Sequence, residues 1–335
     1  MSSPDLSYPL LPPRLPDRAA SDQRVQFVPR FDTAYPSTYP MKAFRSRRRI
    51  WLHALLFVLT MLTTSVVGAH MQLSFTAGIP LEPDFAMFIS WWRHPAVLLQ
   101  GLPFSLTLLA ILLAHEFGHY LACLFYGLDA SVPYFLPAPT FTGTLGAFIR
   151  IRSPIFAKRA LFDVGISGPI AGFIFLLPAL SIGLAFSKII PGIAQQGSLV
   201  FGTPPLLWLM EKLIFPGVPP ADIYLHPVAR AAWIGIFATA LNLLPVGQLD
   251  GGHILYSLIG EKHRPISRLF IALLIPLGFF YWQGWLLWAG ILFFFARKHP
   301  SIYDFTAIGE GRRRLGILAL AIFLLCFTVA PIGAS

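Results

Sequence analysis

The sequence predicts a polytopic α-helical membrane protein with about six or seven transmembrane spans. Hydrophobic residues make up 56% of the 335-residue chain, whereas charged residues make up only 12%. Several apolar runs approach or exceed the roughly 20 residues that a helix needs to cross a bilayer. The net charge of +10 comes from basic residues that cluster beside these runs, as the positive-inside rule expects. The sequence shows no basic face with interleaved aromatic residues, so we expect no nucleic-acid partner.

The first 40 residues have the composition of a disordered cytosolic tail. Residues 1–40 contain eight prolines and little apolar periodicity. Five basic residues follow at 42–49, directly before an apolar run at about 50–69. A nucleic-acid patch is the weaker interpretation of this cluster, because the apolar run follows at once. The cluster should instead hold the N-terminus in the cytosol, with residues 41–335 forming one transmembrane domain.

Further spans are expected along the rest of the chain, at about 101–126, 161–187, 228–244 and 315–332. The interval 188–225 is mixed in composition and predicts an amphipathic helix on the outer surface of the membrane. The basic residues at 262–268 are expected in a cytosolic loop.

The apolar stretch 269–296 has two interpretations. A single helix of this length would span about 42 Å and would need strong tilt. Two short helices turning at Gln283-Gly284 would keep the basic clusters at 297–299 and 312–314 in the cytosol. We favour the helical hairpin.

The central motif is His-Glu-Phe-Gly-His at 115–119, which lies inside the expected span 101–126. His115 and His119 are one turn apart on one helix face, so both imidazoles can reach one zinc ion. Glu116 lies about 100° around the helix, close enough to polarise a zinc-bound water without being a ligand. Ionisable groups inside a membrane are candidates for function.

A catalytic zinc site needs a third protein ligand. Cys123 continues the spacing of the two histidines, but it lies about 12 Å along the axis from the first of them, too far for one ion. His226 and His299 flank the ends of expected spans and are better explained as interfacial residues. Asp250 and His253 remain, both just after the span 228–244.

Helix geometry favours this second region. His115 is about 21 Å inward from the start of its span and Asn242 about 22 Å inward from the start of its own, and both helices run the same way. Asp250 suits a site of two histidines and a carboxylate, with His253 nearby, and Gly251 and Gly252 let the backbone turn close to the metal. The alternative role for Asp250 is a helix cap.

The segment 131–152 is not expected to be helical, because it contains three prolines and two glycines. Residues 144–151 have the composition of a strand. Since the segment directly follows the histidine helix, we expect a re-entrant β-hairpin beside the zinc site, which is tolerated where protein or a watery cavity satisfies its backbone. An ordinary loop on the cytosolic surface is the alternative.

Three motifs together carry a family resemblance: the H-E-x-x-H, the N-x-x-P-x-x-x-L-D-G-G at 242–252 and a Gly-Thr-Leu-Gly strand at 143–146. In this combination the chain resembles the site-2 protease family of intramembrane zinc metalloproteases, peptidase family M50, over about 50–335, with a core at 97–260. The resemblance implies one Zn²⁺ per chain and a multi-pass protein, for which we expect a bacterial cytoplasmic membrane.

The resemblance also implies roles for individual residues. His115, His119 and Asp250 would be the zinc ligands, and Glu116 the general base. Asn242 would bind the substrate backbone or stabilise the oxyanion. The glycines at 160–172 look like those of the family's third core helix and would permit tight packing against the site. The interval 188–225 is too short for a PDZ domain, so the chain looks like the PDZ-less branch.

The expected function is hydrolysis of peptide bonds in or near transmembrane segments of membrane proteins, in regulated intramembrane proteolysis. A substrate helix must unwind first, and an edge strand can supply backbone partners, here through Thr144, Gly146, Ala147 and Phe148. The lipid bilayer and a regulatory membrane protein of unknown identity are further expected partners. The alternatives are a membrane metal transporter and a catalytically inactive scaffold.

Overall fold

The computed structural model describes residues 50–82, 84–90, 95–197, 200–295, 304 and 306–333. All of them belong to one compact unit, Arg49–Ser335. The expected tail at 1–40, the basic cluster at 42–49 and the cluster at 297–299 lie outside the described residues.

The described chain is mostly helical, and four helical stretches are long and apolar enough to cross a membrane. They are α1 (Ile50–Ala77), η2 with α3 (Pro95–Gly101 and Leu102–Phe125), α4 (Lys158–Ala185), and the run of α8, η4 and α9 (Asp250–Ile259, Gly260–Lys262 and His263–Phe280). The shorter helices of the described chain include α7 (Pro227–Asn242), α10 (Gly284–Phe295) and α11 (Glu310–Cys326).

The long helices are apolar on both their buried and their exposed faces. In α3, Leu108 is fully buried whereas Leu106 is 54% exposed and Leu121 likewise 54% exposed. A helix that is hydrophobic all round is stable only in a large core or in lipid. The composition of α3 therefore fits a helix surrounded partly by protein and partly by hydrocarbon.

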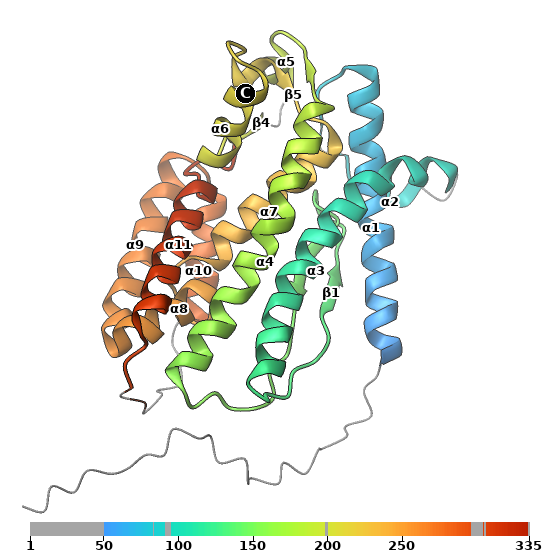
Figure 1. Ribbon diagram of the computed structural model, residues 1–335. Helices are drawn as coiled ribbons and strands as arrows, with labels where there is room; N and C mark the ends of the chain where they lie inside the picture. Colours follow the sequence, from blue (N-terminus) through green and yellow to red (C-terminus); the bar gives the residue numbers. More distant parts are fainter. Residues whose placement is uncertain are drawn as a thin grey trace, which may run out of the picture. The chain divides into compact units, whose positions relative to one another are not determined.

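Helices α3, α4 and α7 pack closely against one another and form the core of the unit (Figure 1). Small residues permit this contact: a β-carbon on Gly118 of α3 would lie 2.4 Å from the carbonyl oxygen of Ser167 in α4. A β-carbon on Gly183 of α4 would lie 2.3 Å from the amide nitrogen of Ala229 in α7. Such close backbone approach is how membrane helices gain packing energy without a hydrophobic driving force.

The segment after α3 forms a β-hairpin, as the sequence predicts. Strand β1 (Tyr134–Pro137) pairs antiparallel with β2 (Thr144–Phe148). The hairpin contacts α1 through β1 and α3 through β2 (Figure 1). Near its tip, the Thr63 hydroxyl of α1 donates to the carbonyl oxygen of Gly143 at 2.6 Å. Thr63 lies about 20 Å from the start of α1, so the hairpin reaches the middle of that helix.

Short elements gather at the end of the unit where α1 and α4 end and α7 begins (top of Figure 1). They include α6 (Pro205–Ile214), the predicted amphipathic helix, and two small sheets. The remaining short helices and strands of the described chain are α2 (Met87–Ser90), β3 (Lys188–Ile189), α5 (Ile193–Gln196), β4 (Val200–Phe201), η3 (Pro220–Asp222), β5 (Ile223–Tyr224) and β6 (Ile332–Gly333). In the two small sheets, β3 pairs with β5 and β4 pairs with β6.

The stretch 269–296 contains two helices, as favoured from the sequence, because α9 ends at Phe280 and α10 begins at Gly284 and packs against it. The expectation of a basic loop at 262–268 is wrong. These residues form the end of η4 and the first turns of α9. The chain instead breaks at Gly260, whose φ of +62° is accessible to glycine at little cost.

Candidate metal centre

Helix α3 presents two buried imidazoles on one face. His115 and His119 are 6% and 7% exposed, and their Nε2 atoms are 3.2 Å apart. Nδ1 of His119 lies 2.7 Å from the carbonyl oxygen of Val164 in α4. A carbonyl oxygen only accepts hydrogen bonds, so Nδ1 carries the proton and Nε2 keeps a free lone pair. That lone pair points at the neighbouring imidazole.

A carboxylate from the other half of the chain meets these imidazoles. Asp250 is the first residue of α8, and its Oδ2 lies 3.1 Å from Nε2 of His115 and 3.3 Å from Nε2 of His119. The loop 243–249 folds tightly under α8, because a β-carbon on Gly251 would lie only 2.1 Å from the carbonyl oxygen of Leu243. The glycine there lets the chain reverse and turn Asp250 toward α3.

The three ligand atoms lie within 4.8 Å of one another and form one candidate metal site. Zinc binds nitrogen and oxygen ligands at about 2.0–2.1 Å in tetrahedral sites, which places neighbouring ligand atoms roughly 3.3 Å apart. The observed separations of 3.1–3.3 Å match that geometry. The structure thus brings together the three residues that the sequence nominated.

Glycines of α4 form the floor beneath the imidazoles. A β-carbon on Gly168 would lie 2.1 Å from Nε2 of His119, and one on Gly172 would lie 3.2 Å from Cβ of His115. The first distance is incompatible with any side chain, whereas the second requires only a small adjustment. The sequence predicts tight packing here from the glycine-rich segment 160–172, and the structure confirms it.

Glu116 is buried next to the three ligand side chains, at 7% exposure. His115, His119 and Asp250 all act on its carboxylate electrostatically, and the backbone amide of Ile149 faces it. Glu116 is not a member of the three-residue ligand group. The carboxylate of Glu116 therefore lies beside the candidate metal site. The amide of Ile149, the residue directly after β2, contacts it.

Asn242 also reaches the centre, from the C-terminal end of α7. Its amide nitrogen lies 3.1 Å from Nε2 of His115. An amide that close to a ligand atom aims its donor into the volume where a metal and its substrate would sit. The equal depth expected for His115 and Asn242 on two similarly oriented helices is therefore observed.

The other residues considered as ligands lie elsewhere. Cys123 is fully buried further along α3, and His226 caps the start of α7 by accepting from the amide of Val228. His253 lies on α8 with its Cβ 3.1 Å from the position of a β-carbon on Gly165. His299 lies outside the described residues. The sequence does not predict the contacts of the Val164 carbonyl and the Ile149 amide with the centre. Every residue except proline carries both groups, so the amino-acid type does not indicate such a contact.

Backbone directions along β2 show which groups are free for another strand. Alternate residues of a strand point their backbone N–H and C=O to opposite edges. Arg150 faces the β1 side, since its N–H donates to Oγ of Ser131 at 2.9 Å and its carbonyl accepts from the Ser131 amide at 3.0 Å. Ile149 faces the other way, toward Glu116. Ala147, two residues earlier, therefore points its N–H and C=O to that outer edge as well.

The outer edge of β2 faces away from β1. In the described part of the chain the sheet has two strands, β1 and β2, so no third strand pairs with this edge. Thr144 stabilises the hairpin itself, because its hydroxyl donates to the carbonyl of Leu136 at 2.8 Å and accepts from the amide of Gly146 at 2.9 Å. Gly146 adopts a φ of +101°. Phe148 is 44% exposed and stacks on Tyr134 of β1.

Comparison with known proteins gives a family match: the model of peptidase family M50 matches residues 103–282, which include all the residues of the centre.

The chain is also similar to plant proteins, among them the following three. It is 32% identical over 244 residues to the probable zinc metalloprotease EGY1, chloroplastic, of Oryza sativa subsp. japonica (70% of this chain, 41% of the relative). It is 29% identical over 243 residues to the Arabidopsis thaliana protein of that name (69% and 43%), and 31% identical over 258 residues to the probable zinc metalloprotease EGY2, chloroplastic, of Arabidopsis thaliana (71% and 43%). The chain spans less than half the length of these relatives.

Proposed function

The chain belongs to peptidase family M50, and from this membership and the buried His–His–Asp centre we propose that it is an intramembrane zinc metalloendopeptidase. The observation that carries the proposal is the cluster of His115, His119 and Asp250, whose ligand atoms lie within 4.8 Å of one another. Two of the three come from α3, a helix long and apolar enough to cross a bilayer. The names of the similar plant proteins agree with this function.

One zinc ion per chain would be held by His115, His119 and Asp250. The observed donor separations and the free lone pair on His119 Nε2 support this ligand set. When bound, zinc supplies a Lewis acid that polarises a scissile carbonyl and makes water a better nucleophile.

Glu116 is proposed as the general base. Its carboxylate is buried beside the ligands, so it can take a proton from the attacking water and later give it to the leaving amine. Asn242 is proposed as a hydrogen-bond donor to the developing oxyanion or to the substrate backbone, because its amide nitrogen is aimed into the centre. His253, Gly251 and Gly252 would support Asp250 from α8.

The outer edge of β2 is proposed as the substrate clamp. A transmembrane helix hides its carbonyls in internal hydrogen bonds, so it must unwind before cleavage. Ala147 offers an outward N–H and C=O, and the next outward residue is Ile149, whose amide faces Glu116. A substrate strand paired to this edge would therefore pass the general base. Thr144 and Gly146 would shape the edge, and Phe148 would contact substrate side chains. A loop without this role remains the alternative.

The membrane arrangement is proposed to include six or seven spans, with α7, α10 and α11 adding to the four long stretches. The bond between Thr63 and Gly143 half way along α1 supports a re-entrant hairpin. The guanidinium of Arg159 at the start of α4 donates to the carbonyl of Ala307 at 2.9 Å, and Arg312 at the start of α11 pairs with Asp163 at 2.6 Å. These contacts support placing the starts of α4 and α11 on the same side of the membrane, which we propose is the cytosolic side.

The proposed domain arrangement is a cytosolic tail at 1–40 and a transmembrane protease domain at 41–335, with its core at 97–260. Substrates would be transmembrane proteins within the same bilayer, under control of a regulatory membrane protein. We propose a bacterial cytoplasmic membrane with the N-terminus in the cytosol. A chloroplast membrane is the alternative, because the similar plant proteins carry the word chloroplastic in their names.

The decisive experiment compares the purified wild-type chain with Glu116→Gln in lipid nanodiscs. A protease keeps zinc in the variant but loses cleavage of a transmembrane model substrate by about 10²-fold or more. A metal transporter would keep metal flux in the variant, and an inactive scaffold would show no cleavage even in the wild type. Either of the last two results would overturn the proposal.

A further inference from the structure

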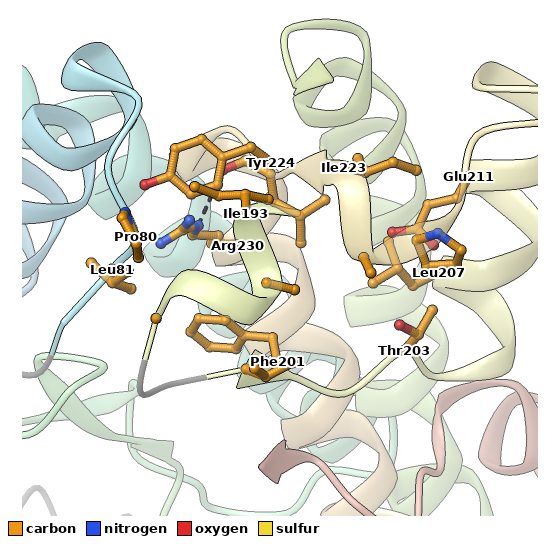
Figure 2. A pocket seen from close by; sticks show the side chains of 16 residues that line it. Pro80, Leu81, Ile193, Phe201, Thr203, Leu207, Glu211, Ile223, Tyr224 and Arg230 are labelled. Carbon is orange, nitrogen blue, oxygen red and sulfur yellow. Dashed lines mark hydrogen bonds between the residues drawn. The ribbon is translucent and has the colours of Figure 1, made fainter. Parts of the chain in front are cut away.

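A cavity lined by two charged side chains lies far from the metal centre. It has a volume of about 420 Å³ and lies among α5, α6, β4, β5 and the first turn of α7 (Figure 2). Arg230 of α7 is one of its lining residues. Arg230 and Asn242 are twelve positions apart on α7, a rise of about 18 Å. The cavity is therefore separate from the proposed chemistry.

Arg230 is buried in this cavity with part of its guanidinium unpaired. The residue is only 4% exposed. Its Nε donates to the carbonyl of Leu225 at 3.1 Å, and the guanidinium lies 4.8 Å from the ring centroid of Tyr224. Nη1, in contrast, has no hydrogen-bond partner among the residues that the structure describes. The side chain is thus held firmly while one donor remains available.

Glu211 of α6 shows the same pattern with the opposite charge. It is also 4% exposed, and its Oε2 has no hydrogen-bond partner in the described part of the chain. Figure 2 shows the two side chains on different sides of the cavity, Arg230 beside Tyr224 and Glu211 beside Leu207. Among the described residues, Glu211 and Arg230 do not form an ion pair with each other.

Two separated and incompletely paired charges are costly in a buried site. An unpaired buried charge destabilises a protein, because it loses hydration without gaining a partner. A guanidinium on one side attracts an anion, and a carboxylate on the other side attracts an ammonium. A single molecule that carries both groups would satisfy both side chains.

The walls between the two charges are largely apolar, and they include Leu81, Phe201, Leu207 and Ile223. The volume falls within the range of about 300–1,000 Å³ that is usual for small-molecule sites. A compact ligand with a small apolar portion fits these walls.

We propose that this cavity binds a zwitterion whose anionic group pairs with Arg230 and whose primary ammonium pairs with Glu211. The chemistry is shared by free α-amino acids or short peptides and by phosphoethanolamine lipid headgroups. A titration of soluble probes, with and without a competing lipid, distinguishes the two sources.

The test uses the full chain in phosphatidylcholine nanodiscs and isothermal titration calorimetry. The probes are L-leucine, O-phosphoethanolamine, N-acetyl-L-leucine, which lacks the ammonium, and L-leucinamide, which lacks the carboxylate. At least one of the first two should bind at one site per chain. If L-leucine binds, the two truncated probes should bind at least about tenfold more weakly, since each leaves one buried charge unpaired. If nanodiscs with phosphatidylethanolamine abolish binding of the soluble probes, the source is the lipid.

Two variants remove one charge each. In Glu211→Gln, the probes with and without the ammonium should bind equally, and in Arg230→Met the preference for the anionic group should vanish. Each variant removes an unpaired buried charge, so at least one of the two should fold. A single folded variant is enough to test the inference. Lys212→Gln, an exposed neighbour on α6, is the control and should bind as the wild type does. No binding of either zwitterion at millimolar concentrations, or unchanged selectivity in a folded variant, would overturn the inference.

Discussion

The imidazole of His119 lies directly on Gly168, so close that a β-carbon there would be 2.1 Å from Nε2. We predict that Gly168→Ala displaces the imidazole and weakens zinc binding by about 10–100-fold, the usual cost of disturbing the support of a metal ligand. Gly172→Ala is the matched control on the same helix, because its β-carbon would lie 3.2 Å from His115. Zinc content after dialysis against a chelator measures both. If Gly168→Ala keeps as much zinc as Gly172→Ala, the close contact between Gly168 and His119 is not needed for zinc binding.

The carboxylate of Asp250 should be required for metal binding. Replacing His115, His119 or Asp250 by alanine removes one of three ligand atoms that lie 3.1–3.3 Å apart, so zinc should fall well below one per chain and cleavage should be lost. His253→Ala is the comparison: it removes a supporting side chain but no ligand atom, so its zinc content should stay well above that of Asp250→Ala. If Asp250→Ala retains zinc and His253→Ala does not, the ligand assignment must pass to His253.

Proline substitution in β2 should separate a substrate clamp from a passive loop. Ala147→Pro removes the outward N–H and should abolish cleavage of a transmembrane substrate. Phe148→Pro should abolish it too, but its N–H faces β1, so the hairpin itself is disturbed. Phe148→Leu should have only a mild effect. Zinc content should be unchanged in all three variants, because the segment contains no ligand. The clamp is wrong if a zinc-loaded Ala147→Pro chain cleaves at the normal rate.

Cysteine labelling should place three positions on the same side of the membrane. Single cysteines introduced at 43, 157 and 310 should react only with reagents on the cytosolic side. The contacts of Arg159 with Ala307 and of Arg312 with Asp163 require 157 and 310 to agree. Both natural cysteines are fully buried, so background labelling should be low. Labelling of position 310 from outside would contradict both the helical hairpin and these contacts.

Stability should depend on pH through Glu211. Burial raises the pKa of this carboxyl from 4.5 to about 7, although the adjacent Lys212 opposes the shift. At this carboxyl the folded state then binds more protons than the unfolded state between these values. The contribution of Glu211 to stability is therefore greatest below pH 4.5 and falls as the pH rises toward 7. Glu211→Gln removes this pH-dependent loss. The free energy of unfolding of the variant, relative to the wild type, should therefore increase by on the order of 3 kcal/mol at most between pH 4.5 and 7.

Thermal unfolding in detergent at both ends of the window measures this gain. Glu310→Gln is the control, because it removes an exposed carboxyl that lies outside the cavity. If the difference between Glu211→Gln and the wild type stays constant across the window, the buried carboxyl does not titrate in this range.

The local parts of the candidate site follow from the sequence alone. His115, Glu116 and His119 lie within five residues of one helix, and the 3.6-residue period fixes their relative directions. Membrane thickness restricts where helices begin, so equal residue counts from the two helix starts are enough to predict Asn242 and His115 at the same depth. The break between α9 and α10 was also predictable, because one helix would have exceeded the bilayer.

The tertiary structure decided the features that depend on main-chain partners and on close approach. The bond from His119 to the Val164 carbonyl and the amide of Ile149 beside Glu116 involve groups that every residue carries, so residue type holds no trace of them. The helical conformation of 262–268 was missed because charge pattern reports the side of a membrane and not local conformation. The shared cavity of Glu211 and Arg230 depends on how α6 packs near the start of α7. Packing between distant segments is set by the summed shape of many side chains, and no short motif records it.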